Sequence, residues 1–322
     1  MYRQCWALCS VRHSSTEALA LTCARALLLA VLVLPAAMRP AQGADAPAPL
    51  PQPQVLQLQD DDQRSLVLPR AAQRIVSLAP GATAMLFAAG AGERVVGTSD
   101  YSNEPQAAKA IERVGDSQSF DLERILTLHP DVVVVWSGGT SPTQIARLEG
   151  VGLRIYRHRV TRLDDIAPSL LRLGRLAGTQ AAAQAAAAEL TQRIAALRSR
   201  YLQAAPASVL LQAWDRPIYT VGRAEIMTDV IHACGYRNLY EDLADPGPAV
   251  TLESVLARDP DIILALAPDA NSARDWVAGW SAYASMRAVH SGRVLAWTDQ
   301  RLSRLGPSIV DAAEELCRAL RR

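Results

Sequence analysis

Two kinds of apolar pattern alternate along most of this chain. Short continuous apolar runs of strand length are separated by segments in which apolar residues recur at helical spacing. The predicted strands cover residues 74–78, 94–99, 131–136, 154–159, 208–214, 261–266 and 293–298. The predicted helices between and after them cover residues 82–90, 121–129, 141–152, 225–235, 252–259 and 307–322. Continuous apolar strands that alternate with helices are typical of parallel α/β sheets covered on both faces.

Two further segments flank or interrupt this alternation. A short hairpin is predicted at residues 55–69, where two apolar stretches enclose the turn "DDDQR". Residues 177–205 are rich in alanine and have no Gly or Pro after Gly178, which favours one long helix. A helix of about 25 residues spans roughly 38 Å, enough to cross from one domain to another.

An internal repeat relates the two groups of strands. "LERILTLHPDVVVV" begins at Leu122 and "LESVLARDPDIILA" begins at Leu252. Five identities share one displacement of 130 residues: Leu122, Glu123, Leu126, Pro130 and Asp131 recur as Leu252, Glu253, Leu256, Pro260 and Asp261. A constant displacement across five identities favours two related lobes. We therefore divide the chain into an N-terminal lobe (55–165), a helical segment with the connecting helix (166–205) and a C-terminal lobe (206–322).

The N-terminal residues have the composition of a secretory signal. Basic residues precede an apolar run at 26–37, and the small residues of "AQGADAPAP" follow it. This run is shorter than the roughly 20 residues that a bilayer-spanning helix needs, although an N-terminal membrane anchor remains the alternative. We expect residues 1–43 to be a signal peptide and 44–54 to be a disordered linker.

Charge and cysteine content narrow the class of protein. The formal net charge is +1, from 33 basic and 32 acidic residues, so no bulk attraction to nucleic acid or anionic membrane is expected. Removal of the predicted signal leaves two of the five cysteines, Cys234 and Cys317. In an oxidising compartment two such thiols form a natural disulfide pair, and two buried free thiols are the alternative.

The sequence carries no recognised catalytic constellation. "GAGERV" lacks the third glycine of a dinucleotide loop and follows a helix, whereas that loop must follow a strand. There is no P-loop, no nucleophile elbow, and no paired histidine spacing that suits a metal. We therefore expect neither an enzyme nor a metal site.

Aromatic residues at strand ends are the most informative candidates. The chain has two Phe but six Trp, and Trp136 and Trp214 each end a buried strand, one in each lobe. Tyr101 follows another strand. The carboxyl ends of parallel strands line the crevice where such sheets bind ligands, so these rings would stack on a large planar or apolar ligand. The alternative is that the two indoles cap their own cores. Gly138 and Gly139 follow Trp136 and are expected to leave its ring uncrowded.

At these residues the chain resembles the periplasmic cobalamin-binding proteins of ABC importers. The resemblance runs from about residue 55 to the C-terminus. It is strongest in "RIVSLAPGATAMLFAAGAGERVVGTSDYSNEP", in "VGDSQSFDLERILTLHPDVVVVWSGGTSPTQIARLEGVG" and in "CGYRNLY". It implies two Rossmann-like α/β lobes joined by one long α-helix, the class III periplasmic binding protein fold. It further implies a periplasmic receptor without catalysis or cofactor that carries a corrinoid as cargo.

The resemblance also implies roles for individual residues. Tyr101 and Trp136 match positions that pack against the corrin ring, and Trp214 is a variant position with the same expected role. Arg304 matches a retained arginine that would meet the amide side chains of the ligand. Cys234 and Cys317 match the single disulfide of the family.

Glu123 and Glu253 match a pair of surface carboxylates, one in each lobe, that dock on arginines of the permease dimer. The ATPase subunits complete that partner, and the free receptor is expected to be a monomer. Stabilisation of a helix N-terminus is the other interpretation of both glutamates.

Two positions depart from the family pattern. Gly247 stands where well-known members have an aromatic residue, and Gln300 stands where they have an aspartate. These changes leave the identity of the corrinoid open. A haem receptor, with Tyr101 as the candidate axial ligand, and a ferric-siderophore receptor, with the arginines of residues 301–304, are alternatives within the same fold. A periplasmic α/β enzyme and a scavenger or sensor without a transporter are alternatives from other classes.

Overall fold

The computed structural model describes residues 55–116, 119–202 and 205–321. All of them belong to one compact unit, which begins at Pro51. The predicted signal peptide and linker lie outside the described residues. None of the helices in the described part is both long enough and apolar enough to cross a membrane.

The first lobe is built on a four-stranded parallel sheet with the order β4-β3-β5-β6. Its strands are β3 (Ile75–Ser77), β4 (Val95–Thr98), β5 (Val132–Trp136) and β6 (Ile155–His158). Its helices are α1 (Pro80–Ala88), α2 (Leu122–Thr127) and α3 (Pro142–Gly150), with 3-10 turns η1 (Gly92–Arg94) and η2 (Gln106–Ala110). The hairpin of β1 (Leu56–Gln59) and β2 (Ser65–Leu68) precedes this sheet, as predicted. The four valines of β5 are fully buried, which explains their unbroken apolar run.

The second lobe has a matching parallel sheet with the order β12-β11-β7-β9. Its strands are β7 (Ser208–Gln212), β9 (Arg237–Asn238), β11 (Ile262–Leu266) and β12 (Val294–Trp297). A small antiparallel pair, β8 (Ile218–Tyr219) and β10 (Ala249–Val250), lies beside it. Its helices are α6 (Ile226–Ala233), α7 (Leu252–Arg258), α8 (Ala270–Gly279), α9 (Arg287–His290) and α10 (Ile309–Leu320), with turns η3 (Trp280–Ala282) and η4 (Gln300–Ser303).

The internal repeat has a structural counterpart. β5 and β11 begin at Val132 and Ile262 and have equal lengths. The aspartate before each strand makes the same kind of hydrogen bond. Asp131 accepts one from the backbone N–H of Arg74 at 2.9 Å, and Asp261 accepts one from the backbone N–H of Ser208 at 2.8 Å. Each carboxylate thereby ties the start of the central strand to the start of its neighbour. The repeated "PD" is thus a structural element of both sheets.

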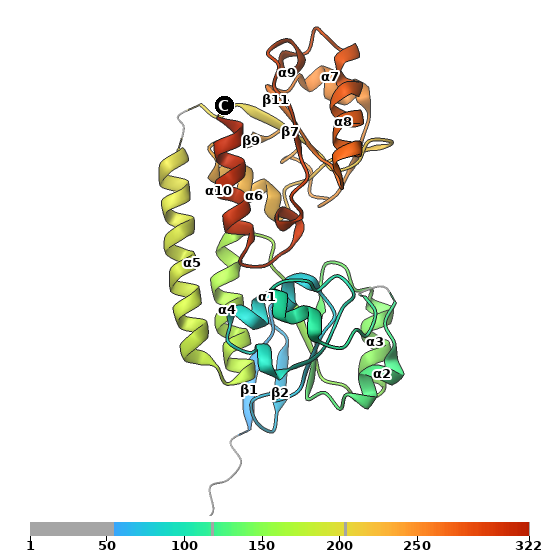
Figure 1. The fold of residues 1–322 in the computed structure, drawn as a ribbon, viewed down its shortest axis with the longest axis vertical. Coiled ribbons are helices and arrows are strands. Elements are labelled where there is room, and N and C mark those ends of the chain that lie inside the picture. The colour runs from blue at the N-terminus through green and yellow to red at the C-terminus, as the bar shows by residue number, and fades with distance from the viewer. Residues whose placement is uncertain (1–54, 117–118, 203–204, 322) are drawn as a thin grey trace, which may run out of the picture. The chain divides into compact units, whose positions relative to one another are not determined.

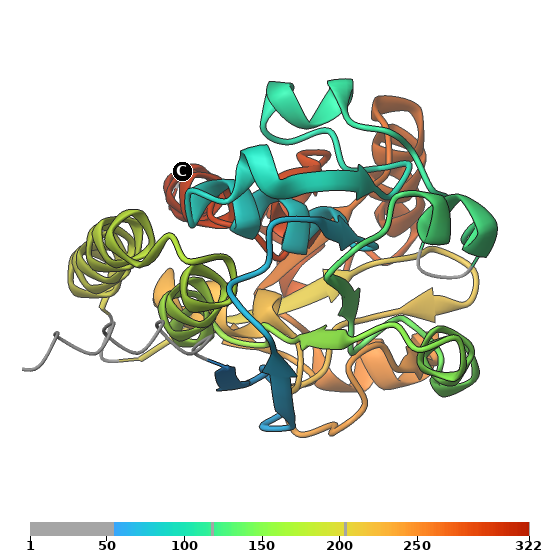
Figure 2. The same cartoon turned by 90° about the horizontal axis from the view of Figure 1, so that it is seen from below.

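A single long helix connects the lobes, as predicted, and a second helix precedes it and packs against it. α4 (Leu163–Ala177) ends where Gly178 takes a left-handed conformation with φ of 71°, and α5 (Gln180–Tyr201) begins after it. The single helix predicted within residues 177–205 is therefore α5, which begins three residues later than expected and ends at Tyr201. The left-handed glycine reverses the chain, so α4 and α5 run side by side in opposite directions (Figures 1 and 2).

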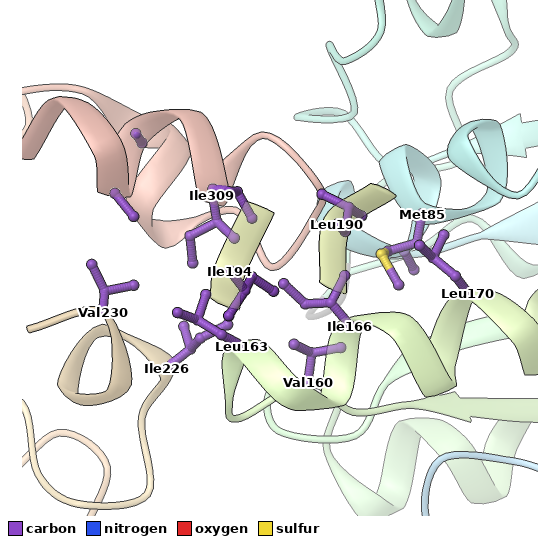
Figure 3. Packing of buried hydrophobic residues seen from close by; sticks show 14 of the residues in the cluster. Met85, Val160, Leu163, Ile166, Leu170, Leu190, Ile194, Ile226, Val230 and Ile309 are labelled. Carbon is purple, nitrogen blue, oxygen red and sulfur yellow. The ribbon is translucent and has the colours of Figure 1, made fainter. Parts of the chain in front are cut away.

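One apolar core runs through both lobes along these helices. Leu190 and Ile194 of α5 belong to the same buried cluster as Met85 of the first lobe and Ile226 and Ile309 of the second (Figure 3). α5 contacts α1, α6 and α10. Because separating the lobes would expose this shared apolar surface, the fold favours a cleft that is formed before ligand binds.

A disulfide bond joins Cys234, which follows α6, to Cys317 of α10, with the sulfur atoms 1.96 Å apart. It links two helices that both pack against α5. The alternative of two free thiols is not what the structure contains.

Candidate functional site

Three adjoining cavities lie at the carboxyl ends of the strands. The Tyr101 cavity, of about 410 Å³, is lined by Tyr101, Trp136 and Arg304 among others. The Trp214 cavity measures about 240 Å³, and the Glu225 cavity, which also reaches Trp136, about 580 Å³. Ser303 lines all three. Because the cavities share walls and draw residues from both lobes, we treat them together as the cleft.

Trp136 forms one wall of the cleft. Its side chain is 36% exposed although it directly follows four buried valines. A Cβ atom added to Gly139 would come within 2.0 Å of the indole ring, and one added to Gly138 within 2.9 Å. The ring therefore lies against the backbone of both glycines, which hold it from behind instead of merely leaving space around it. Ser141 then caps α3 by accepting the N–H of Gln144 at 3.2 Å.

Tyr101 stands on a loop whose backbone is well anchored. Its side chain is 66% exposed. The Arg113 guanidinium donates to the carbonyl oxygens of Ser99 at 2.6 Å and Ser102 at 2.9 Å, and to the hydroxyl of Thr98 at 2.9 Å. This exposed aromatic ring is thus carried by a fixed loop, which lowers the entropy lost when a ligand packs on it.

Trp214 lines the second-lobe side of the cleft and is 52% exposed. Its ring meets Trp276 edge to face at 5.9 Å between centroids. Trp276 and Trp280 are buried, and Trp280 donates its indole N–H to Gln212 at 2.8 Å. The alternative of two indoles that cap their own cores does not describe Trp136 or Trp214, because both rings keep exposed surface on the cleft.

Arg304 reaches the Tyr101 cavity, but its guanidinium is already engaged. It donates to one carboxylate oxygen of Glu104 at 2.8 Å, and the Ser308 hydroxyl donates to the other at 2.9 Å. Sequence reasoning identified Arg304 and missed Glu104. The only available signal was an acidic residue close to Tyr101 in the same loop.

A buried charge network behind the cleft also escaped sequence reasoning. The side chain of Asp61, in the turn of the β1–β2 hairpin, is 1% exposed. One carboxylate oxygen accepts hydrogen bonds from Tyr156 Oη and Arg172 Nε, each at 2.7 Å. The other accepts His158 Nδ1 at 3.0 Å, Arg159 N at 3.0 Å and Ser169 Oγ at 2.8 Å. Three aspartates in a hairpin turn predicted only a turn.

The network shifts the acid–base properties of its members. Burial by itself would raise the pKa of Asp61, but the hydrogen bond and charge of His158, together with the other donors, hold it well below its ordinary value. Burial raises the pKa of Tyr156 well above its usual range. His158 pairs with Trp136 across β5 and β6, lines the Tyr101 cavity, and has no partner at Nε2 among the described residues. Asp61 therefore supports the wall that carries Trp136.

Glu225 is the acidic residue of the Glu225 cavity. Burial raises its pKa to about 7, and a backbone hydrogen bond from Ile226 only partly offsets this. Nothing in the sequence around it predicted a perturbed carboxyl group.

The two positions that depart from the family pattern both face the cleft. Gly247 lines the Glu225 cavity, and a Cβ atom added there would meet nothing within 4 Å. Gln300 lines the Tyr101 and Trp214 cavities. Among the residues that the structure describes, no group of three His, Cys, Asp or Glu side chains is arranged to hold a metal ion.

Glu123 and Glu253 lie away from the cleft cavities and occupy equivalent places in the two lobes. Each is exposed and is the second residue of its helix, α2 or α7. The capping residues are Asp121, which accepts the N–H of Arg124, and Thr251, which accepts that of Ser254. Each cap satisfies one backbone N–H. Hydrogen bonds from its own backbone N–H and from the Thr251 side chain lower the pKa of Glu253, so this carboxylate also stabilises the N-terminus of α7.

A two-lobed α/β fold with a preformed, aromatic cleft defines a class of binding protein, and comparison with known proteins agrees. Residues 75–301 match the periplasmic binding protein family, to which this chain belongs. The vitamin B12-binding protein of Vibrio cholerae is 34% identical over 256 residues, which are 80% of this chain and 92% of that protein. The vitamin B12-binding protein of Yersinia pestis is 32% identical over 79% of this chain and 89% of its own length.

Solved structures are similar as well. The periplasmic vitamin B12-binding protein of Vibrio cholerae aligns with a TM-score of 0.70 and 33% identity, and the match covers 78% of this chain and 97% of that one. The periplasmic haem-binding protein of Roseiflexus aligns with a TM-score of 0.65 and 26% identity, covering 77% and 98% respectively. The expected class III fold is confirmed, and the chain is a periplasmic binding protein of the kind that serves ABC importers.

Proposed function

We propose that this protein captures cobalamin or a related corrinoid in its cleft and delivers it to an ABC importer of the inner membrane. The observation that carries the proposal is the set of three exposed aromatic side chains, Tyr101, Trp136 and Trp214, on the walls of one cleft. Large exposed rings are unfavourable in water unless a ligand covers them. A corrin ring offers a broad planar surface for stacking.

The polar groups of the cleft suit the edge of a corrin ring. Corrinoids carry primary amide side chains, which both donate and accept hydrogen bonds. Arg304, Gln300 and Ser303 line the Tyr101 cavity and supply both kinds of partner. The vitamin B12-binding relatives, at 34% and 32% identity, support the same ligand class.

Delivery requires a partner, and Glu123 and Glu253 are its proposed contacts. Both are exposed at equivalent places in two related lobes, which suits a permease dimer with two-fold symmetry and one basic site per subunit. The ATPase subunits would act on the permease. The receptor is proposed to be a free monomer in the periplasm, exported by the signal peptide of residues 1–43, and to perform no catalysis.

Haem is the second candidate ligand, favoured by two observations. The Roseiflexus haem-binding protein has a similar fold, and the Tyr101 cavity contains Tyr101 and His158, residue types that can ligate haem iron. His158 has a buried Nε2 without a partner among the described residues, and its Nδ1 is held by Asp61.

Titration of the purified protein with cyanocobalamin and with haemin separates the two ligands. Cyanocobalamin is expected to quench Trp fluorescence saturably, with a Kd below about 10 μM. Trp136→Ala should weaken this binding more than tenfold, because it removes a stacked ring. If haemin binds with a shifted Soret band and cyanocobalamin does not bind, the ligand of this protein is haem and not a corrinoid.

A further inference from the structure

The charged side chains that line the cleft are largely paired. The arginines on its walls are Arg304, which pairs with Glu104 at 2.8 Å, and Arg159, which pairs with Asp62 at 2.6 Å. No arginine or lysine lining the three cavities in the described part of the chain is without a carboxylate partner. The cleft therefore offers no free cation to a carboxylate-bearing ligand.

The pair of Glu104 and Arg304 is fixed from both sides. Ser308 holds the second oxygen of Glu104, so the carboxylate cannot turn away without losing that bond. The segment after Arg304 packs closely on α1, because a Cβ atom added to Gly81 would come within 2.9 Å of the Leu305 carbonyl oxygen. Both charges are about two-thirds covered, with side-chain exposures of 28% for Arg304 and 32% for Glu104. Arg304 lines the Tyr101 cavity, and Glu104 pairs with it without lining the cavity itself.

We propose that Glu104 is a specificity-determining residue, which makes the Tyr101 cavity select neutral, amide-bearing tetrapyrroles over carboxylate-bearing ones. This inference rests on the proposed function. A primary amide can accept from Arg304 through its carbonyl oxygen and adds no charge beside the pair. A carboxylate can also accept from Arg304, but it brings a second negative charge beside Glu104.

Arg304 and Glu104 have separate roles in this selection. Arg304 alone would attract an anionic side chain, such as a propionate. Glu104 cancels that attraction through its ion pair with Arg304. Selection at this point therefore depends on the ligand being neutral where its competitor carries a negative charge.

Matched ligands test the inference directly. Cyanocobalamin is compared at pH 7.5 with its three monocarboxylates, in each of which one amide of the corrin periphery is hydrolysed. The wild-type protein is expected to bind at least one monocarboxylate about tenfold more weakly than the parent. Glu104→Gln, which frees the positive charge of Arg304, is expected to reduce that ratio to less than about twofold or to reverse it.

Two further variants complete the design. Glu112→Gln changes an exposed glutamate of the same lobe that pairs with Arg124 and lines none of the three cavities, and it should leave the ratio unchanged. Arg304→Gln leaves the charge of Glu104 unopposed, and it should increase discrimination against the carboxylate. This second variant keeps the test valid if Glu104→Gln folds poorly.

The outcomes are distinct. Equal binding of all three monocarboxylates and the parent by the wild type would overturn the inference, as would an unchanged ratio in Glu104→Gln or a reduced one in Arg304→Gln. Cyanocobalamin binding would remain in each of those cases. Failure of the wild type to bind cyanocobalamin would instead overturn the proposed function, and this inference with it.

Discussion

Replacing Asp61 with asparagine tests whether the hairpin turn holds the wall of the cleft. The two oxygens of Asp61 accept five hydrogen bonds, and each oxygen has one donor that cannot reverse its role. One oxygen faces Arg172 Nε–H and the other faces the backbone N–H of Arg159. Whichever way the asparagine amide is placed, its NH2 group meets a fixed donor.

The expected loss is set by the burial of this group. The substitution removes a carboxylate that is 1% exposed and leaves Arg172 without its counter-charge. Breaking a buried charge pair costs about 3–5 kcal/mol, and we expect Asp61→Asn to lower the free energy of unfolding by about 3 kcal/mol. Urea denaturation at pH 7 measures this as a lower midpoint at unchanged slope.

The pH dependence gives a second signature of the same interaction. The pKa of Asp61 is lowered in the folded protein, so its contribution is present above its unfolded pKa near 3.8 and is lost on acidification. The difference between wild type and Asp61→Asn should therefore shrink as the pH falls below about 4. Asp275→Asn, an exposed carboxylate on α8, is the control and should change stability by less than about 0.5 kcal/mol. If Asp61→Asn changes stability no more than this control does, the reasoning is refuted.

Two further predictions concern the cleft itself. Gly139→Ala should weaken cyanocobalamin binding about tenfold, because its Cβ would come within 2.0 Å of the Trp136 ring and displace it. The matched control is Gly150→Ala in α3, whose Cβ meets nothing within 4 Å and which lines none of the three cavities, and equal affinities for the two variants would contradict the role given to Gly139. Glu225 has a pKa raised to about 7 from an ordinary 4.5, so its stabilising protonated form is fully present below pH 4.5 and is lost as the pH rises through 7. Glu225→Gln should remove this decline, worth about 3 kcal/mol by pH 8 in thermal or urea unfolding, and an identical pH profile in wild type and variant would disprove the shift.

The parts of the fold that sequence predicted are those that depend on local pattern. The strands of both sheets that carry long apolar runs were found, because β5 and its equivalent β11 are buried on both faces and need continuous apolar residues. The start of α5 was predicted three residues early, at 177, because the left-handed Gly178 that ends α4 lies at the edge of a segment of high helix propensity. The strands β8, β9 and β10 have two residues each, which is too short to show an alternation of apolar and polar residues in the sequence.

Some residues of the candidate site could be predicted from the sequence and others could not. Tyr101, Trp136 and Trp214 were predicted from their places at strand ends, and the structure brings all three to one cleft. The contacts of Glu104 with Arg304, 200 residues apart in sequence, and of Asp61 with Arg172, 111 residues apart, could not be predicted. Such long-range polar pairs depend on how elements pack, and the sequence near each residue carries no sign of its partner.

The most direct test of the account is a calorimetric titration of the purified protein with cyanocobalamin at pH 7.5. The account predicts one molecule bound per chain, a Kd below about 10 μM, and a negative heat-capacity change from the apolar surface that the aromatic walls bury. Absence of saturable heat, or binding that is equally tight in Trp136→Ala, would contradict the claim that this cleft is a corrinoid site.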